Sequence, residues 1–151
     1  MAQCTFDSPI GRLIAVADEQ GICSLDFEKD GEIFDEENRH LTLLKQELGA
    51  YFEGKLKQFS VPLTPKGTSF QQGVWNVLKT IPYGETISYT QEAILLKHPK
   101  ATRAVANANG KNKIAIIIPC HRVIAKDGSI GGYSSGVWRK EYLLALEQKY
   151  K

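Results

Sequence analysis

The pattern of apolar positions changes along the chain from short runs to helical repeats. Residues 12–17 (RLIAVA) and 22–27 (ICSLDF) are apolar runs of strand length, and residues 18–21 (DEQG) between them have the composition of a hairpin turn. Next come apolar residues that share one face of a helix: Leu41, Leu44, Leu48 and Phe52. Gly54 follows them as a typical stop signal. This part of the chain therefore predicts a small antiparallel sheet that carries one helix.

The second half of the chain is predicted to be mostly helical. Its first helix is marked by apolar residues that share one face: Phe70, Val74, Val77, Leu78 and Ile81. Residues 82–84 (PYG) break this helix. Ser88 and Gln91 then fit a capping box, with the serine at the N-cap and the glutamine three residues later, for a short helix over residues 89–96.

The next helix is expected over residues 99–109, with Pro99 at a first helical position that tolerates proline and Gly110 at its end. Two short helices joined by a tight turn are typical of a helix-turn-helix, although an ordinary helical hairpin fits the same pattern. The second helix is rich in alanine, which suits close approach either to a nucleic-acid groove or to another helix. A last helix is expected over residues 137–150.

The charge of the chain divides in the same way as its predicted elements. Pro62 and residues 64–68 (TPKGT) mark a linker, so we expect one domain over residues 1–62 and another over residues 63–151. The first carries six basic and twelve acidic side chains, and the second carries thirteen basic and five acidic ones. The positive half either faces a polyanion such as nucleic acid or carries solvated charges that segregated by chance. The predicted fold class is an α/β domain followed by a mostly α domain with a helix-turn-helix.

The composition gives no sign of a membrane span or of secretion. No apolar run approaches the ~20 residues that a membrane span needs, and no basic stretch followed by an apolar one opens the sequence. Three cysteines, Cys4, Cys23 and Cys120, cannot all be paired in a monomer, which favours a reducing cytoplasm. Cys4, Cys23 and His40 form an incomplete set of zinc ligands, so we expect neither a metal nor a cofactor.

The strongest candidate for chemistry is Cys120, in the segment 114–123 (IAIIIPCHRV). The apolar residues before Pro119 predict a buried strand, and His121 could take the thiol proton to form the reactive thiolate. Because successive side chains of a strand point to opposite faces, either the chain turns at Pro119 or a water bridges Cys120 and His121. A base needs an orienting acceptor, and Glu147 on the last helix is the best candidate. The alternative is an inert buried cysteine beside a surface histidine.

Several motifs together resemble the O6-methylguanine-DNA methyltransferase family, also called methylated-DNA–protein-cysteine methyltransferases. The resemblance runs from about Phe70 to Glu147 and includes PYGETISY, ATRAV, IPCHRV, the GGYS loop and LLALE. The SPIG and YFEGK segments of the first half are similar to the variable α/β domain of the family. The resemblance implies that Cys120 accepts an alkyl group from the O6 of guanine in double-stranded DNA, or from O4-alkylthymine, in a single turnover without a cofactor.

The resemblance also implies roles for other residues. His121 would draw the thiol proton through a water, with Glu147 holding the imidazole, and Asn112 would support the turn at the active site. Tyr89 would donate to the departing guanine, and Arg103 would enter the base stack where the alkylated nucleotide is flipped out. Further DNA contacts are expected from Ser88, Ala104 and Asn107, and the substrate pocket is expected to include Val123, Tyr133, Ser134 and Lys140.

The sequence departs from the family pattern at one position, and it leaves two other functions as alternatives. Ser135 stands where the family commonly has glycine after tyrosine and serine, which leaves the tolerance of bulky adducts such as benzyl open. A non-catalytic protein that flags lesions is one alternative, against which the retained Cys120, His121 and Glu147 count. A cysteine hydrolase is the other, against which the basic helix-turn-helix half counts. The sequence predicts a monomer that acts on DNA and not at a membrane.

Overall fold

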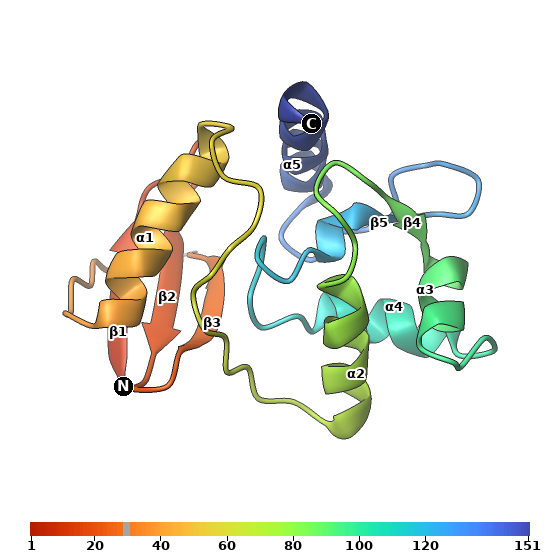
Figure 1. The fold of residues 1–151 in the computed structure, drawn as a ribbon, viewed down its shortest axis with the longest axis horizontal. Coiled ribbons are helices and arrows are strands. Elements are labelled where there is room, and N and C mark those ends of the chain that lie inside the picture. The colour runs from red at the N-terminus through yellow and green to blue at the C-terminus, as the bar shows by residue number, and fades with distance from the viewer. Residues whose placement is uncertain (29–30) are drawn as a thin grey trace. The chain divides into compact units, whose positions relative to one another are not determined.

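The computed structural model describes residues 1–28 and 31–151, which form two compact units (Figure 1). The first unit consists of Met1–Lys66 and Lys113–Ala115, and the second of Gly67–Asn112 and Ile116–Lys151. Residues 63–66 and 113–115 thus belong with the first unit, whereas the division drawn from the sequence places them in the second. No helix in the described ranges is long and apolar enough to cross a membrane.

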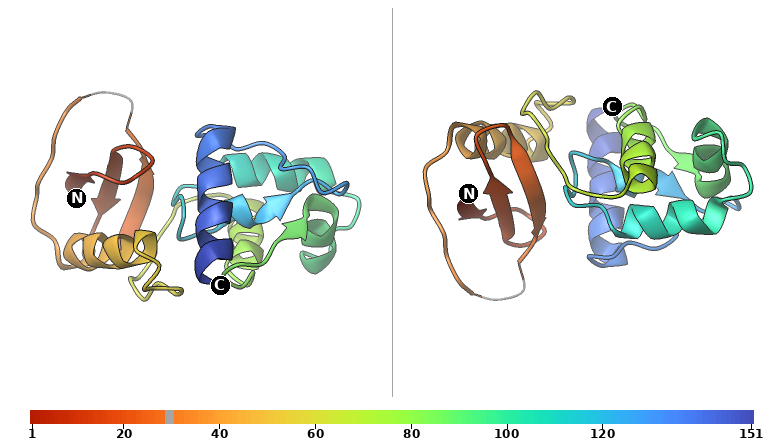
Figure 2. Two further views of the ribbon diagram at one scale, coloured as in Figure 1. Left: turned by 90° about the horizontal axis from the view of Figure 1, so that it is seen from above. Right: turned by 90° about the horizontal axis from the view of Figure 1, so that it is seen from below.

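The first unit is a three-stranded antiparallel sheet with one helix packed against it (Figure 2). The strands lie in the order β1-β2-β3, and their bounds, with those of the helix, are Ala2–Phe6 (β1), Leu13–Ala17 (β2), Ile22–Phe27 (β3) and Arg39–Phe52 (α1). Leu13, Ala15 and Ala17 alternate along β2 and are all 0% exposed, so one face of the central strand forms the core. The predicted sheet and helix are confirmed, and β1 is a strand that the apolar pattern did not predict.

Local hydrogen bonds show why these elements begin and end where they do. The backbone N–H of Asp18 donates to the carbonyl of Gly21 at 3.0 Å and closes the hairpin predicted between β2 and β3. The Asn38 side chain accepts hydrogen bonds from two backbone N–H groups of the first turn of α1. Gly54 adopts a φ of 77° after α1, and its N–H donates to the carbonyl of Tyr51 at 3.0 Å. A glycine accepts this left-handed conformation at little cost, which confirms it as the stop signal.

The second unit is mostly helical. Its helices are Ser69–Leu78 (α2), Tyr89–Leu95 (α3), Thr102–Gly110 (α4), Val137–Tyr150 (α5) and the short 3-10 helix Cys120–Arg122 (η1), and its parallel strand pair is Ile87–Ser88 (β4) and Val123–Ile124 (β5). Trp75 of α2 is buried and donates its indole N–H to the carbonyl of Ala108 at 3.0 Å, which joins α2 to α4. The predicted fold class is therefore confirmed.

The helices α3 and α4 pack against each other as the predicted helix-turn-helix pair (Figure 1). The Ser88–Gln91 capping box is present at the start of α3, with both of its hydrogen bonds. The helix ends in a turn in which Lys97 adopts a left-handed φ of 68° and His98 donates its N–H to the carbonyl of Ala93 at 3.0 Å. This is the hydrogen bond of a Schellman motif, here with lysine in the place that glycine usually takes.

The prediction that Pro99 lies at the first helical position was wrong. The helix α4 begins at Thr102, and Ala101, which has no side-chain hydrogen bond to offer, is its N-cap. The N–H of Ala101 donates to the carbonyl of His98 at 2.9 Å, so Pro99 lies in a tight turn that precedes the helix. The fixed φ of proline suits the second position of such a turn as well as it suits a helix start, and the sequence does not distinguish the two.

The prediction of a strand before the cysteine was also wrong. Within this segment only Ile114 forms an isolated β-bridge, with Leu25, and both residues belong to the first unit. The following residues form a turn in which Ile116 adopts a φ of 70°. Ile114, Ile116 and Ile118 are nevertheless buried. The apolar run thus reflects burial of an irregular segment and not the pairing of an extended one.

Candidate active site

The chain turns sharply at Pro119 and presents Cys120 at the start of η1. Pro119 has a φ of −83° and a ψ of 64°, and the N–H of Cys120 donates back to the carbonyl of Ile118 at 2.8 Å, which is an inverse γ-turn. The side-chain amide of Asn112 donates to the same carbonyl at 2.7 Å and to the Cys120 sulfur at 3.4 Å. The chain therefore turns at Pro119, as one of the two alternatives expected, and Asn112 supports the turn, but no hydrogen bond among the described residues joins the Cys120 sulfur to the His121 imidazole.

Cys120 is half-buried and lines a cavity of about 530 Å³ within the second unit. The residues that line it are Tyr89, Ala106, Asn109, Gly110, Cys120, Gly132, Tyr133 and Ser134. The structure therefore brings four residues predicted for the site around one space: Tyr89, Cys120, Tyr133 and Ser134. The other four were not predicted, and three of them come from the last two turns of α4.

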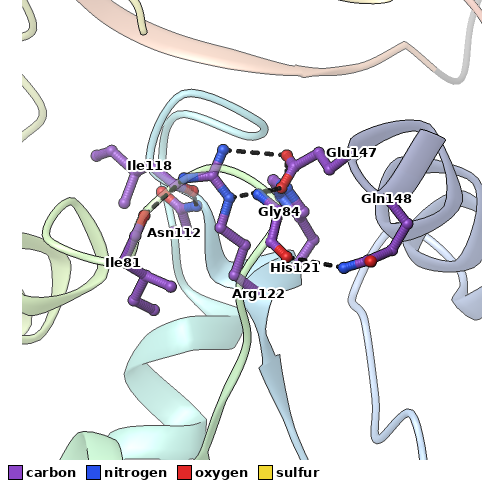
Figure 3. A network of polar contacts seen from close by, with 8 residues as sticks. All are labelled: Ile81, Gly84, Asn112, Ile118, His121, Arg122, Glu147 and Gln148. Atoms are coloured by element: carbon purple, nitrogen blue, oxygen red, sulfur yellow. Dashed lines mark hydrogen bonds and ion pairs between the residues drawn. The ribbon is translucent and has the colours of Figure 1, made fainter. Parts of the chain in front are cut away.

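The two residues that follow Cys120 in the chain, His121 and Arg122, belong to a buried network around the Glu147 carboxylate (Figure 3). His121 and Glu147 are 0% and 1% exposed, and His121 Nε2 lies 2.7 Å from Glu147 Oε2. Arg122 donates to both carboxylate oxygens, from Nε at 2.8 Å and from Nη2 at 3.0 Å, and its Nη1 donates to the carbonyl of Ile81 at 2.7 Å. The backbone N–H of Gly84 donates to Glu147 Oε1 at 3.1 Å. The structure thus joins His121 and Glu147, and it adds Arg122 to them.

These contacts decide the charge that each group carries. Burial acts to raise the pKa of Glu147, but the contacts with His121 and Arg122 outweigh it and hold this pKa well below its usual range. Burial lowers the pKa of His121, so its imidazole is neutral at neutral pH. A neutral imidazole that donates Nε2–H to Glu147 has an acceptor at Nδ1. That Nδ1 is buried and has no hydrogen-bond partner among the described residues.

The thiol of Cys120 is protonated at rest. Burial raises its pKa, while the hydrogen bond from Asn112 and the charge of Lys140 act in the opposite direction. Lys140 is 0% exposed and donates from Nζ to the carbonyls of Val123 at 2.6 Å and Gly132 at 3.1 Å. Burial lowers the pKa of Lys140 to about 8, against the influence of Cys120, which raises it. Lys140 is therefore the cation whose field favours the thiolate, and it also fixes two backbone segments of the site.

The predicted leaving-group donor, Tyr89, lies at the first residue of α3. Burial raises the pKa of its phenol, and a hydrogen bond with the backbone of Gly132 acts against this. A Cβ added at Gly131, which has a φ of 75°, would lie 2.9 Å from the Tyr89 hydroxyl oxygen. The glycine therefore allows the loop to approach Tyr89 closely, and the protonated phenol remains able to donate a hydrogen bond at the edge of the cavity.

The residues predicted to contact DNA lie on and before α4. Arg103, Ala104 and Asn107 are exposed and share one face of α4, while Ala106 of the same helix lines the cavity. Ser88 is half-buried, and its hydroxyl accepts the N–H of Gln91 as the cap of α3. The structure does not bring Arg103, Ala104 and Asn107 into the cavity, and they form an outer face beside it.

Three residues of the site are not predicted by the sequence pattern: Arg122, Asn109 and Glu92. Arg122 is part of the IPCHRV motif, but only its burial beside Glu147 reveals a role. Asn109 is one of the residues that line the cavity, and its side-chain amide donates to Glu92 Oε1 at 2.7 Å; both residues are buried. The adjacent Ala93 is also buried, but nothing in the local pattern separates Glu92 from a solvated helix carboxylate.

The chain resembles known proteins over nearly its whole length. Two family models match it: the DNA binding domain of 6-O-methylguanine DNA methyltransferase over residues 69–149 and the ribonuclease-like domain over residues 1–65. A methylated-DNA–protein-cysteine methyltransferase of Methanosarcina acetivorans is 47% identical, over 97% of this chain and 98% of the relative.

Solved structures of two other proteins are also similar to this chain. The Mycobacterium tuberculosis OGT in complex with DNA matches with a TM-score of 0.92 and 42% identity, over 99% of this chain and 94% of that chain. An O6-methylguanine DNA methyltransferase from Methanococcus jannaschii matches with a TM-score of 0.72 and 26% identity, over 95% of this chain and 92% of that chain. The chain therefore belongs to the 6-O-methylguanine DNA methyltransferase family.

Proposed function

We propose that this protein repairs DNA directly, by moving an alkyl group from the O6 of guanine in duplex DNA to the sulfur of Cys120. The observation that carries the proposal is that Cys120 lines a cavity of about 530 Å³ and is followed in the chain by His121, which is buried and paired with the buried Glu147 carboxylate. One bond from carbon to sulfur forms and the bond from that carbon to O6 breaks. The product at Cys120 is a thioether, and no group among the described residues that line the cavity can return it to a thiol, so each chain reacts once. Because the relative from M. tuberculosis was crystallised with DNA, DNA is the substrate class proposed here.

The proton of the thiol passes to His121 in this proposal. No hydrogen bond joins the Cys120 sulfur to the imidazole among the described residues, so one water carries the proton to Nδ1. Glu147 holds Nε2–H and thereby keeps Nδ1 free to accept. Arg122 in turn holds Glu147 from a second side, which fixes the orientation of the whole group.

The remaining pocket residues orient and release the base. The Tyr89 hydroxyl donates to the departing guanine, and Tyr133 and Ser134 close over it. The carbonyl of Val123 accepts from Lys140 and keeps a second lone pair for the amino group of guanine. Lys140 thus shapes the pocket and, by its charge, lowers the free energy of the thiolate.

The exposed face of α4 provides the contact with DNA. Arg103 enters the base stack in place of the flipped nucleotide, and Ala104 and Asn107 lie against the groove, with Ser88 at the start of α3 near the backbone. The alkylated base must leave the duplex because its O6 substituent is shielded inside it. We place the protein in the cytoplasm as a monomer, where a thiol nucleophile stays reduced.

The intact mass of the protein after mixing with O6-methylguanine duplex tests the function. The wild-type chain should gain one methyl group, mapped to Cys120, and Cys120→Ser should gain none while it retains DNA binding. Cys23→Ser is the matched control and should gain the methyl group as the wild type does. Methyl uptake by Cys120→Ser would mean that another residue is the acceptor. DNA binding without any uptake by the wild type would instead favour the protein that flags lesions, and repeated turnover would favour the hydrolase.

A further inference from the structure

A second buried carboxyl group lies close to the cavity and is not used in the proposed reaction. Glu92 of α3 is 0% exposed, and its Oε1 accepts from Asn109 Nδ2 of α4 at 2.7 Å. The other oxygens of the two side chains, Glu92 Oε2 and Asn109 Oδ1, are both buried and have no hydrogen-bond partner among the described residues. The two oxygens without a partner therefore belong to two residues that are already bonded to each other.

An ionised Glu92 does not account for this arrangement. A buried acceptor without a donor destabilises the fold, and it does so more strongly when it is charged. Within the described part of the chain, no basic side chain lies at ion-pair distance from Glu92. A protonated carboxyl has an O–H, and a carboxylic acid and an amide can form a closed pair with two parallel hydrogen bonds. One proton on Oε2 would give both oxygens a partner.

The groups around Glu92 favour the same state. Of the elements packed against α3, the segments α2, β4 and β5 have no ionisable side chain, and α4 has only Arg103, which is exposed. The ionisable groups affected by Glu92 are Tyr89 on its own helix and Cys120 on η1, and a negative charge on Glu92 raises the pKa of both. Burial raises the pKa of Glu92 to about 7, although the bond from Asn109 acts to lower it.

We propose that Glu92 is a positioning residue that works in its protonated form, donating from Oε2–H to Asn109 Oδ1. The pair joins α3 to α4 and holds the Asn109 side chain in one orientation at the edge of the cavity. Loss of the proton breaks one of the two hydrogen bonds and puts a negative charge where it opposes thiolate formation at Cys120. The effect on the reaction rests on the proposed function, whereas the protonation of Glu92 is independent of it.

Infrared spectroscopy tests the protonation state without any alkyl transfer. The difference spectrum between wild type and Glu92→Gln should contain the C=O band of a protonated carboxyl at pH 6, and this band should disappear with a midpoint near pH 7. A carboxylate band in its place at pH 6 would overturn the proposal. Carbon NMR of labelled glutamate carboxyls in the wild-type chain follows the same titration and covers the case in which the variant does not fold.

Methyl transfer at two pH values tests the positioning role. A glutamine at position 92 keeps both hydrogen bonds to Asn109 and cannot ionise, so the rate at pH 9 divided by the rate at pH 6 should be higher for Glu92→Gln than for the wild type. Glu92→Leu, which removes both bonds, should react more slowly at both pH values. The exposed Glu85→Gln is the control and should keep the wild-type ratio. Equal ratios for wild type and Glu92→Gln, with methyl transfer intact, would refute the role while leaving the proposed function standing.

Discussion

Replacing Glu147 by glutamine is expected to weaken both the stability of the protein and the reactivity of Cys120. The carboxylate accepts hydrogen bonds from His121, from Arg122 and from the backbone of Gly84, and it is 1% exposed. An exposed residue on the last turns of a helix would tolerate this change with little effect. The burial of Glu147 and the charge of Arg122 beside it exclude that outcome.

The size of the effect on stability follows from the ion pair. Removing one charge of a buried pair costs about 3–5 kcal/mol, because the other charge is left buried without compensation. The glutamine oxygen can still accept one bond from Arg122, so we expect a loss at the lower end of that range. A comparable change at the exposed Glu141, on the same helix α5, should alter the free energy of unfolding by less than about 0.5 kcal/mol.

The effect on reactivity follows from the tautomer of His121. The glutamine can offer N–H to the imidazole Nε2, which moves the imidazole proton to Nδ1, and a protonated Nδ1 cannot accept the thiol proton. General-base assistance is worth roughly 10²–10⁴ in rate, and the loss should fall in that range at neutral pH. The dependence of the rate on pH should shift to the alkaline side. DNA affinity should change little, because Glu147 contributes no positive charge.

The assay is single-turnover methyl uptake across a range of pH, with denaturant unfolding of the same three proteins: wild type, Glu147→Gln and Glu141→Gln. An unchanged pH profile for Glu147→Gln would remove Glu147 from the proton relay. An unchanged free energy of unfolding would refute the argument from the buried Arg122 charge. The two outcomes are independent, so each part of the reasoning is tested by itself.

Three further predictions concern single side chains. Arg103→Ala should slow repair of duplex DNA far more than reaction with free O6-benzylguanine, because the arginine matters only where there is a base stack; similar losses on both would place Arg103 in the chemistry. Lys140→Met should move the pH dependence of Cys120 alkylation to the alkaline side, since the lysine charge lowers the pKa of the thiol, and an unmoved profile would contradict this. Because the pKa of Glu92 is raised from 4.5 to about 7, its contribution to stability is present below pH 4.5 and is lost as the pH rises to about 7. The loss is roughly 3 kcal/mol at 1.36 kcal/mol per pH unit. In Glu92→Gln the free energy of unfolding should not show this dependence on pH, and the same dependence in the variant as in the wild type would disprove the prediction.

The elements that the sequence predicts well are those that local chemistry determines. The hairpin at residues 18–21, the glycine stop at Gly54 and the capping box of Ser88 and Gln91 each depend on residues within four positions of one another. The bounds of α5, Val137–Tyr150, also agree with the prediction. At such positions hydrogen bonds to the backbone are made by the same few residues that the sequence displays together.

Elements that depend on distant contacts were missed or wrong. Ile114–Ile118 is apolar because it is buried, and burial does not by itself distinguish a strand from a turn with a left-handed residue such as Ile116. The left-handed residue that ends α3 is Lys97, which no sequence rule marks as a stop. Arg122 and Glu92 both look like surface charges, and only their partners across the fold, Glu147 and Asn109, show otherwise.

Burial and the balance of charges around the site keep the Cys120 thiol protonated, and therefore weakly reactive, in the resting protein. The charge of Arg122 balances the charge of the Glu147 carboxylate, so the carboxylate can orient His121 while the imidazole stays neutral. Because the imidazole is neutral, it adds no positive charge that would offset the effect of burial on the pKa of Cys120. A protonated thiol is also the form that resists oxidation, since the thiolate is the species that oxidants attack. Lys140 is the cation that favours ionisation of the Cys120 thiol. Burial lowers the pKa of Lys140 to about 8, and its ammonium group donates hydrogen bonds to the carbonyls of Val123 and Gly132. A site with an ionised thiol at rest would react faster with any electrophile, and each such reaction would consume a whole chain. A raised pKa for Cys120 thus protects a thiol that can react only once, and in the proposed reaction His121 accepts the thiol proton at the moment of transfer.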